Sequence, residues 1–178
     1  MDMTEKKISS ELIFDGKIIK VFKDKVECPN KEISYREVVK HNGGAAILCI
    51  TENDEVLLIK QFRYAYNEVI YEIPAGKLEK GENPYDAALR ELEEETGNKA
   101  KELEHLCDIY PTCGYSNEVI YLYLAKNCTK THTHFDEDEF IETVYVPLNK
   151  VKEMILDGTL KDGKAICALQ AYLLKYND

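Results

Sequence analysis

The amino-acid sequence predicts an α+β protein built around a mixed β-sheet. Segments with the residue pattern of strands outnumber segments with the pattern of helices, and the helices interrupt the strands at irregular intervals. A doubly wound parallel sheet would instead show strands and helices in regular alternation. The chain has 178 residues, 44% of them hydrophobic, which is enough for one domain with a core of its own.

The first half of the chain is predicted to consist of strands. The earliest segments alternate apolar and polar side chains, as half-buried strands do. After the turn sequence HNGG, the run AAILCI has no polar residue and predicts a fully buried strand, with EVLLIKQFR as its neighbour across TEND. Pro74 and Gly76 are expected to end the last of these strands. The predicted strands cover residues 8–26, 33–40, 45–50, 55–63 and 68–76.

A helix with clear start and stop signals follows a polar loop. Asn83 suits the N-cap, Pro84 suits the first turn, and Gly97 suits the position just past the last turn. The remaining chain alternates less regularly between strands and helices. Strands are predicted at about 103–110, 118–125 and 140–146, and helices over 147–157 and 163–176.

Charge and cysteine content narrow the function classes. The formal net charge of −10 argues against non-specific binding to nucleic acid or to an anionic membrane, so neither is expected as a partner. It would also repel a phosphate-bearing substrate unless metal ions or a few placed cations intervene. The six cysteines show no C-x-x-C spacing, the start MDMTEKKISS has no apolar segment, and AAILCI is too short to span a bilayer. We therefore expect a cytoplasmic protein with reduced thiols.

Acidic residues crowd the C-terminal end of the predicted helix, in the sequence RELEEETG. Carboxylates there oppose the helix dipole, and each like-charge pair at i,i+3 or i,i+4 costs about 0.2–0.5 kcal/mol. At 3.6 residues per turn, Glu91, Glu94 and Glu95 share an arc of about 100°, while Glu93 points elsewhere. Three carboxylates are therefore expected to cluster beside the core-facing side of the helix.

Two interpretations fit this cluster. An acidic run is usually a solvated face, which for a random chain holds in about three cases of four. Such faces are normally supported by basic residues one turn away; Glu94 has Arg90 and Glu95 has Lys99, but Glu91 has none. Hard oxygen ligands without compensating lysines are what Mg²⁺ or Mn²⁺ requires, so the cluster also predicts a divalent metal site.

The helix and the loop before it share one longer pattern, G-x5-E-x7-R-E-U-x-E-E-x-G, in which U is apolar. A chance match is rarer than about one in ten thousand. With this pattern the chain resembles the Nudix hydrolases, although Asn98 stands where their signature ends on an apolar residue. The resemblance implies an α/β/α sandwich and hydrolysis of a nucleoside diphosphate linked to another group. The matching residues are Gly76, Glu82, Arg90, Glu91, Leu92, Glu94, Glu95 and Gly97.

Roles for individual residues follow from this resemblance. It implies that Glu91, Glu95 and the carbonyl of Ala75 hold the metal. Glu94 would be an auxiliary catalytic carboxylate, and Arg90 would hold the carboxylates in place. Divalent ions at such a site polarise the pyrophosphate and lower the pKa of the attacking water.

The chain has only three arginines, Arg36, Arg63 and Arg90, against twenty lysines. Arginine is favoured where a planar fork must bind phosphate or carboxylate, although ordinary surface use is an equally good account of Arg36 and Arg63 taken separately. Residues 33–148, with YREVVKHNGG, QFRYAYNEVIYEIPAG and YPTCGYSNE, resemble the ADP-ribose pyrophosphatase branch of the Nudix family. That resemblance implies that Arg63 contacts substrate phosphate, that Arg36 reaches the substrate from a dimer partner, and that Glu72 contacts the nucleotide end.

A second acidic run, FDEDEFIE, precedes the strand predicted at 140–146. Taken alone it reads as a solvated loop. The resemblance implies instead that Glu137 is the general base and Glu139 a further metal ligand. The chain departs from the branch at Cys113, where the branch has a proline; Pro111 lies two residues earlier.

Together these features predict a small N-terminal antiparallel sheet over residues 1–40, serving dimerisation, and a Nudix hydrolase domain over 41–178. The predicted activity is hydrolysis of ADP-ribose to AMP and ribose 5-phosphate by a homodimer using Mg²⁺, with Mn²⁺ as the alternative ion. Two other functions stay open at this point. One is hydrolysis of another nucleoside diphosphate sugar or of a nucleoside triphosphate, and the other is a Nudix sensor that binds a nucleotide without cleaving it.

Overall fold

The computed structural model describes residues 1–133 and 140–176, and it divides into two compact units. One unit comprises Met1–Gly43 together with Tyr110–Val119, and the other comprises Gly44–Ile109 together with Ile120–Asp178. The segment Tyr110–Val119 thus leaves the second unit in sequence order and packs with the first. None of the helices in the described ranges is long and apolar enough to cross a bilayer.

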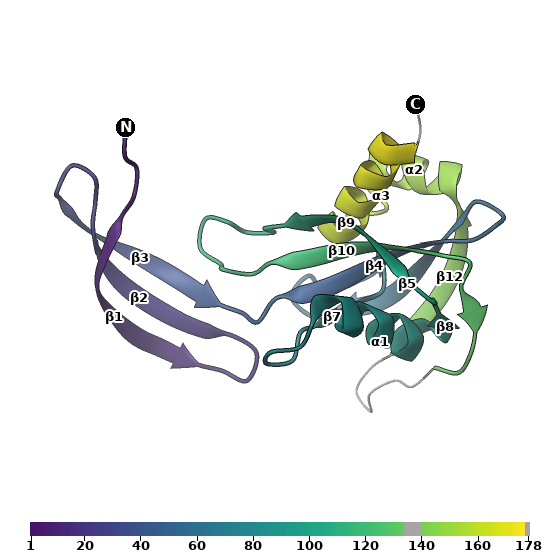
Figure 1. The fold of residues 1–178 in the computed structure, drawn as a ribbon, viewed down its shortest axis with the longest axis horizontal. Helices are drawn as coiled ribbons and strands as arrows, with labels where there is room; N and C mark the ends of the chain where they lie inside the picture. Colours follow the sequence, from purple (N-terminus) through teal and green to yellow (C-terminus); the bar gives the residue numbers. More distant parts are fainter. Residues whose placement is uncertain (134–139, 177–178) are drawn as a thin grey trace. The chain divides into compact units, whose positions relative to one another are not determined.

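The first unit is a three-stranded antiparallel sheet in the order β1-β2-β3 (Figure 1). Its strands are β1 (Lys6–Asp15), β2 (Lys20–Glu27) and β3 (Ile33–Lys40). The backbone of Val39, near the end of β3, bonds to the inserted segment: its N–H donates to Tyr115 at 2.8 Å, and its carbonyl accepts from Asn117 at 3.1 Å. The predicted N-terminal antiparallel sheet is therefore confirmed.

The second unit is built on a mixed sheet with the strand order β12-β5-β4-β10-β9, to which β6 adds beside β5 and β7 beside β4. The β4–β10 pair is parallel and the other pairs are antiparallel. A separate two-stranded ladder joins β8 (Asn98–Lys99) to β11 (Thr129–Lys130). The strands of the large sheet are β4 (Gly44–Ile50), β5 (Glu55–Arg63), β6 (Glu68–Glu72), β7 (Ala75–Lys77), β9 (Leu103–Ile109), β10 (Ile120–Lys126) and β12 (Ile141–Pro147).

Helices cover both faces of this sheet (Figure 1). Helix α1 (Pro84–Thr96) packs over one face, while α2 (Leu148–Leu156) and α3 (Gly163–Tyr176) pack over the other. Successive residues of β4 belong to opposite cores: Ile47 lies in the core under α1, and Leu48 in the core under α2 and α3. A strand covered on both faces has no polar side to present, which explains the uninterrupted apolar run AAILCI. The α/β/α sandwich is confirmed.

One predicted strand is wrong in its extent. Residues 68–76 form two strands, because the chain changes its pairing partner around Pro74. Up to Glu72 it pairs with β5, whereas from Ala75 it pairs with β4. Pro74 has no N–H to donate, and its carbonyl accepts from the N–H of Ile47 at 2.9 Å.

The ends of α1 follow the predicted signals. The Asn83 side chain accepts a hydrogen bond from the N–H of Tyr85, and Gly97 adopts the left-handed conformation with φ 60°. The Gly97 N–H donates to the carbonyl of Glu93 at 2.9 Å, which closes the last turn. The Gly97 carbonyl accepts from Thr131 at 2.8 Å, so the end of the helix is also tied to the segment that follows β11.

Leu92 anchors α1 in its core and has no exposed surface. We expect Leu92→Ala to lower the free energy of unfolding by about 2–5 kcal/mol, because it removes buried methyl groups and leaves a cavity. Leu174→Ala is the matched control, since Leu174 is helical but 84% exposed; its effect should stay within about 0.5 kcal/mol. Urea denaturation of both variants measures the difference, and equal losses would contradict the assigned packing.

Candidate active site

Arg90 is the centre of the acidic cluster on α1. Its Nη1 donates to Glu91 at 2.7 Å and to Glu94 at 2.9 Å, and its Nε donates to Glu82 at 3.1 Å. Burial by itself lowers the pKa of Arg90, but these three carboxylates outweigh it, so the pKa lies above its ordinary value. One guanidinium therefore offsets much of the repulsion among the carboxylates.

The pairing differs from the sequence prediction in two respects. Glu91 was expected to have no basic partner one turn away, yet it bonds to Arg90, its neighbour in sequence. Lys99 was expected beside Glu95 but pairs with Glu93 at 3.2 Å. Spacing along a helix predicts which Cβ atoms are close, whereas a long arginine side chain can also reach an adjacent residue.

Glu95 ties the helix to the large sheet. It is only 4% exposed, and its Oε2 accepts the N–H of Ala75, the first residue of β7, at 2.9 Å. This bond places the backbone of Ala75 beside the acidic face of α1. The Ala75 carbonyl and the Glu95 carboxylate, both predicted metal ligands, therefore belong to residues that are in contact in the folded structure.

Gly76, the first residue of the sequence pattern, makes room for Glu91. A Cβ added at Gly76 would lie 1.8 Å from the Glu91 Cδ and Oε1 atoms, far inside van der Waals contact. The Glu91 side chain is 14% exposed and rests over the backbone of β7. Only glycine at this position allows the carboxylate to approach the strand so closely.

The chemistry of these groups fits a hard divalent cation. Glu91, Glu94, Glu95 and the carbonyl of Ala75 offer oxygen donors only, as Mg²⁺ and Mn²⁺ prefer. Within residues 1–133 and 140–176, no group of three or more His, Cys, Asp or Glu side chains is already gathered in a geometry that could hold a metal. The close approach of Glu91 to Gly76 and the hydrogen bond between Glu95 and Ala75 nevertheless keep the oxygen ligands of α1 and β7 close to one another.

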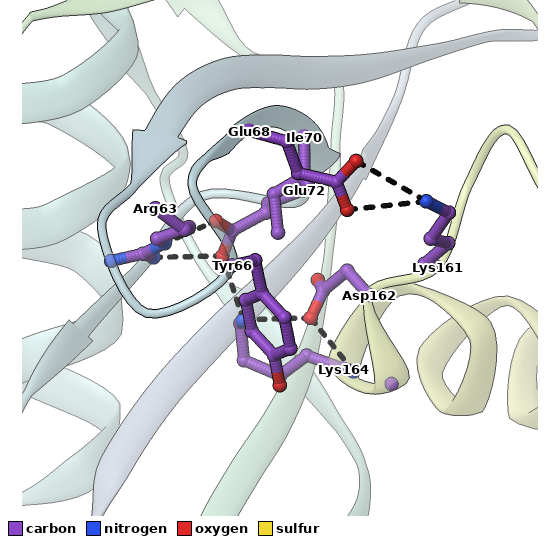
Figure 2. Close-up of a pocket in the computed structure, with 9 residues that line it drawn as sticks. Arg63, Tyr66, Glu68, Ile70, Glu72, Lys161, Asp162 and Lys164 are labelled. Carbon is purple, nitrogen blue, oxygen red and sulfur yellow. Dashed lines mark hydrogen bonds and ion pairs between the residues drawn. The ribbon is translucent and has the colours of Figure 1, made fainter.

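A second charged group lies where β5 and β6 approach the start of α3 (Figure 2). Arg63 donates two hydrogen bonds to Glu72, one from Nε to Oε1 and one from Nη2 to Oε2, the latter at 2.8 Å. The Lys164 ammonium donates to Glu72 Oε2 at 2.9 Å and to Asp162 Oδ1 at 2.8 Å. Four charges of alternating sign therefore run from β5 to α3.

Glu72 is an ionised carboxylate in a buried place. It is 1% exposed, and burial would raise its pKa, but the hydrogen bonds and charges of Arg63 and Lys164 outweigh burial and hold the pKa below its usual value. Hydrogen bonding to Glu72 raises the pKa of Arg63, and the more distant charge of Glu95 adds to this. The Glu95 contribution links this group electrostatically to the acidic face of α1.

A pocket of about 300 Å³ opens beside these charges. It is lined by Arg63, Tyr66, Glu68, Glu72, Lys161 and Lys164, among others (Figure 2). The Arg63 side chain is 41% exposed, and the edge of its guanidinium opposite Glu72 points away from the other labelled residues (Figure 2). An arginine fixed on one side and open on the other can bind a phosphate.

Arg36, a further predicted site residue, belongs to the first unit. Arg36 is on β3, where it pairs with Glu5 and donates to Ser34 at 3.0 Å and to the carbonyl of Tyr35 at 2.8 Å. Glu137 and Glu139 lie outside the described residues. Sequence reasoning missed Asp162 and Lys164. Asp162 had a signal, since it precedes a helix as N-cap residues do, whereas nothing in the sequence marks Lys164 as a partner of Glu72.

We expect Gly76→Ala to weaken Mn²⁺ binding by about 10–100-fold, the range typical when a group that orients a metal ligand is lost. The new Cβ displaces the Glu91 carboxylate, the mobile end of its side chain, so the fold should persist. Electron paramagnetic resonance of Mn²⁺ measures the affinity. Gly114→Ala is the control, because a Cβ there meets no atom within 4 Å. Unchanged Mn²⁺ affinity in Gly76→Ala would contradict a metal site at Glu91 beside Gly76.

Comparison with known proteins gives a consistent result. The family model of the NUDIX domain matches residues 40–169. The chain is 41% identical to the ADP-ribose pyrophosphatase of Bacillus subtilis (strain 168), over 97% of this chain and 95% of that protein. It is 40% identical to the methanol dehydrogenase activator of Bacillus methanolicus, over 93% and 91% of the two chains. A crystal structure of an ADP compounds hydrolase superposes with a TM-score of 0.86 at 20% identity, covering 99% and 98% of the two chains. On the family model, the extended identity and the matching fold, this chain belongs to the Nudix family.

Proposed function

We propose that this chain is a cytoplasmic, Mg²⁺-dependent Nudix hydrolase that converts ADP-ribose and water to AMP and ribose 5-phosphate. The observation that carries the proposal is the complete carboxylate set around Arg90 and Gly76, in a chain 41% identical over 97% of its length to an ADP-ribose pyrophosphatase. Nucleotide-binding domains that do not cleave their ligand typically lack some of these carboxylates.

Each group in the site has a task in this reaction. Glu91, Glu95 and the Ala75 carbonyl would hold the divalent ion, which supplies polarisation of the pyrophosphate and activation of water when bound. Arg90 keeps Glu91 and Glu94 oriented while reducing their mutual repulsion. The oxygen of water is added to one of the two phosphorus atoms as the bridging P–O bond breaks, so each product carries one phosphate.

Arg63 and Glu72 would bind the substrate next to the reacting phosphates. The exposed edge of Arg63 binds phosphate oxygens, and Glu72 holds the guanidinium plane from behind. Glu72 is 1% exposed and bonded to two cations. We therefore assign it the role of holding Arg63, in preference to the predicted contact with the nucleotide end of the substrate. Glu137 as the general base and Glu139 as a further metal ligand stay part of the proposal.

The test compares hydrolysis rates of the wild type, Glu95→Gln and Glu93→Gln. We expect ADP-ribose to be the best substrate of the wild type, and Glu95→Gln to lower turnover by at least about 100-fold, because a metal ligand loses its charge. A glutamine still accepts the Ala75 N–H, so thermal stability should be unchanged or slightly raised. Glu93→Gln is the control. It removes one charge from the same helix, but Glu93 pairs with Lys99, so this variant should keep its activity.

The substrate panel decides between ADP-ribose and the alternatives. It contains ADP-ribose, GDP-mannose and an oxidised nucleoside triphosphate, with release of AMP or phosphate as the readout. The chain is 35% identical, over 76% of its length, to a GDP-mannose pyrophosphatase of Yersinia enterocolitica, which justifies that arm. A higher kcat/KM on another compound of the panel would show that ADP-ribose is not the preferred substrate. Undiminished turnover by Glu95→Gln would contradict the assigned metal site.

We also propose that the N-terminal unit forms a homodimer. All ten residues of β1 are exposed, and the sheet carries large apolar side chains that a monomer would leave in water. Examples are Ile8 at 49%, Leu12 at 48%, Phe14 at 54%, Ile33 at 50% and Tyr35 at 57% exposure. Arg36 lies on the same sheet and would reach the substrate of the second copy.

Light scattering coupled to gel filtration tests the dimer. We expect the wild type to have twice the chain mass and Leu12→Glu to be monomeric, because a buried unpaired charge at the interface costs several kcal/mol. Leu156→Glu is the control, since Leu156 is 88% exposed on α2. A monomeric wild type at micromolar concentration would contradict the proposal.

A further inference from the structure

The chain of ion pairs that runs from Arg63 to Asp162 includes a lysine that is largely enclosed, Lys164. The Lys164 side chain is 19% exposed, and its partners Glu72 and Asp162 are 2% and 7% exposed in their side chains. Removing charges from water costs several kcal/mol for each ion, and pairing only balances that cost. A pair of apolar side chains would fill such a place at least as favourably, so the charges have to be explained by something other than stability.

Both carboxylates that hold Lys164 are anchored in regular structure. Asp162 accepts the N–H groups of Lys164 at 3.2 Å and of Ala165 at 3.1 Å, and thereby caps the start of α3. Glu72 is the last residue of β6. Lys164 spans the distance between them with one hydrogen bond to each carboxylate. The lysine therefore fixes the orientation of the Glu72 carboxylate relative to α3.

The orientation of Glu72 in turn determines that of Arg63. The two carboxylate oxygens receive two parallel donors from Arg63, so the guanidinium plane follows the carboxylate plane. Lys164 donates to the same Glu72 oxygen, Oε2, as Arg63 Nη2, so both cations hold one carboxylate. Without Lys164, Glu72 could rotate, and the Arg63 guanidinium that it holds would lose its fixed direction.

We propose that Lys164 is a positioning residue, which fixes Glu72 so that Arg63 presents its free edge to a phosphate of the substrate. This inference rests on the proposed hydrolysis of ADP-ribose. It assigns no contact between Lys164 and the substrate. The role belongs to the link from α3 to β5, through Asp162, Lys164, Glu72 and Arg63 in that order.

The test is a double-mutant cycle on KM and kcat for ADP-ribose. We expect Lys164→Met, which keeps a long unbranched side chain, to raise KM about 10-fold with kcat within about 3-fold, because binding of substrate and transition state are weakened alike. In an Arg63→Lys background, where the fork is already lost, Lys164→Met should change KM by less than about 2-fold. Lys150→Met removes an equal charge from an exposed pair with Glu153 and should leave both constants unchanged.

A purely structural role gives a different pattern. It would lower kcat and thermal stability together and would add fully to Arg63→Lys, and that additivity would overturn the proposal. If Lys164→Met does not fold, Asp162→Asn replaces it, since asparagine still caps α3 but no longer attracts Lys164 by charge; a smaller rise of KM with the same non-additivity is expected. Wild-type turnover with full additivity refutes only the positioning role, whereas a wild type inactive on ADP-ribose refutes the proposed function and this inference with it.

Discussion

The crowding of carboxylates on one short helix is the constraint on which the candidate site depends. Glu91, Glu94 and Glu95 stand within two turns of α1, where the helix dipole already disfavours negative charge. Arg90 offsets this by bonding to Glu91 and Glu94 at once, and Glu95 is stabilised by a backbone N–H of β7. Arg90 shares one guanidinium among Glu82, Glu91 and Glu94, and these oxygen donors are of the kind that a divalent cation prefers.

The two charged groups of the site use electrostatics in opposite ways. Around α1 the negative charges outnumber the cation, and the group stays receptive to a further positive ion. In the chain of ion pairs from Arg63 to Asp162 the signs alternate and cancel, and both carboxylates are buried. The first arrangement suits recruitment of a metal, whereas the second suits holding a side chain rigidly. In the proposed function, the first group would hold a metal ion and the second would hold Arg63 for a phosphate of the substrate.

Local features of the fold could be predicted from residue patterns and its layers from the resemblance to a family, whereas particular long-range contacts could not be predicted. The caps of α1 at Asn83 and Gly97 depend on neighbouring residues, and the structure has both as predicted. The partner change at Pro74 depends on which strand lies on each side, which no local pattern records. Lys164 meets Glu72 across 92 positions of the sequence, so only the folded topology brings them together. Gly76 could be identified from the sequence as the first position of the pattern. The reason why glycine is required there, the nearby Glu91 carboxylate, is visible only in the folded structure.

The strand change at Pro74 also constrains how this chain can vary in length. Glu72 belongs to the ladder with β5 and Ala75 to the ladder with β4, and only Ile73 and Pro74 separate them. Ile73 has no exposed surface, so the connection offers no slack. Because side chains alternate across a strand, inserting or deleting one residue here would turn either Glu72 or Gly76 to the wrong face. Natural insertions should therefore be absent from the two residues that join the halves of the site.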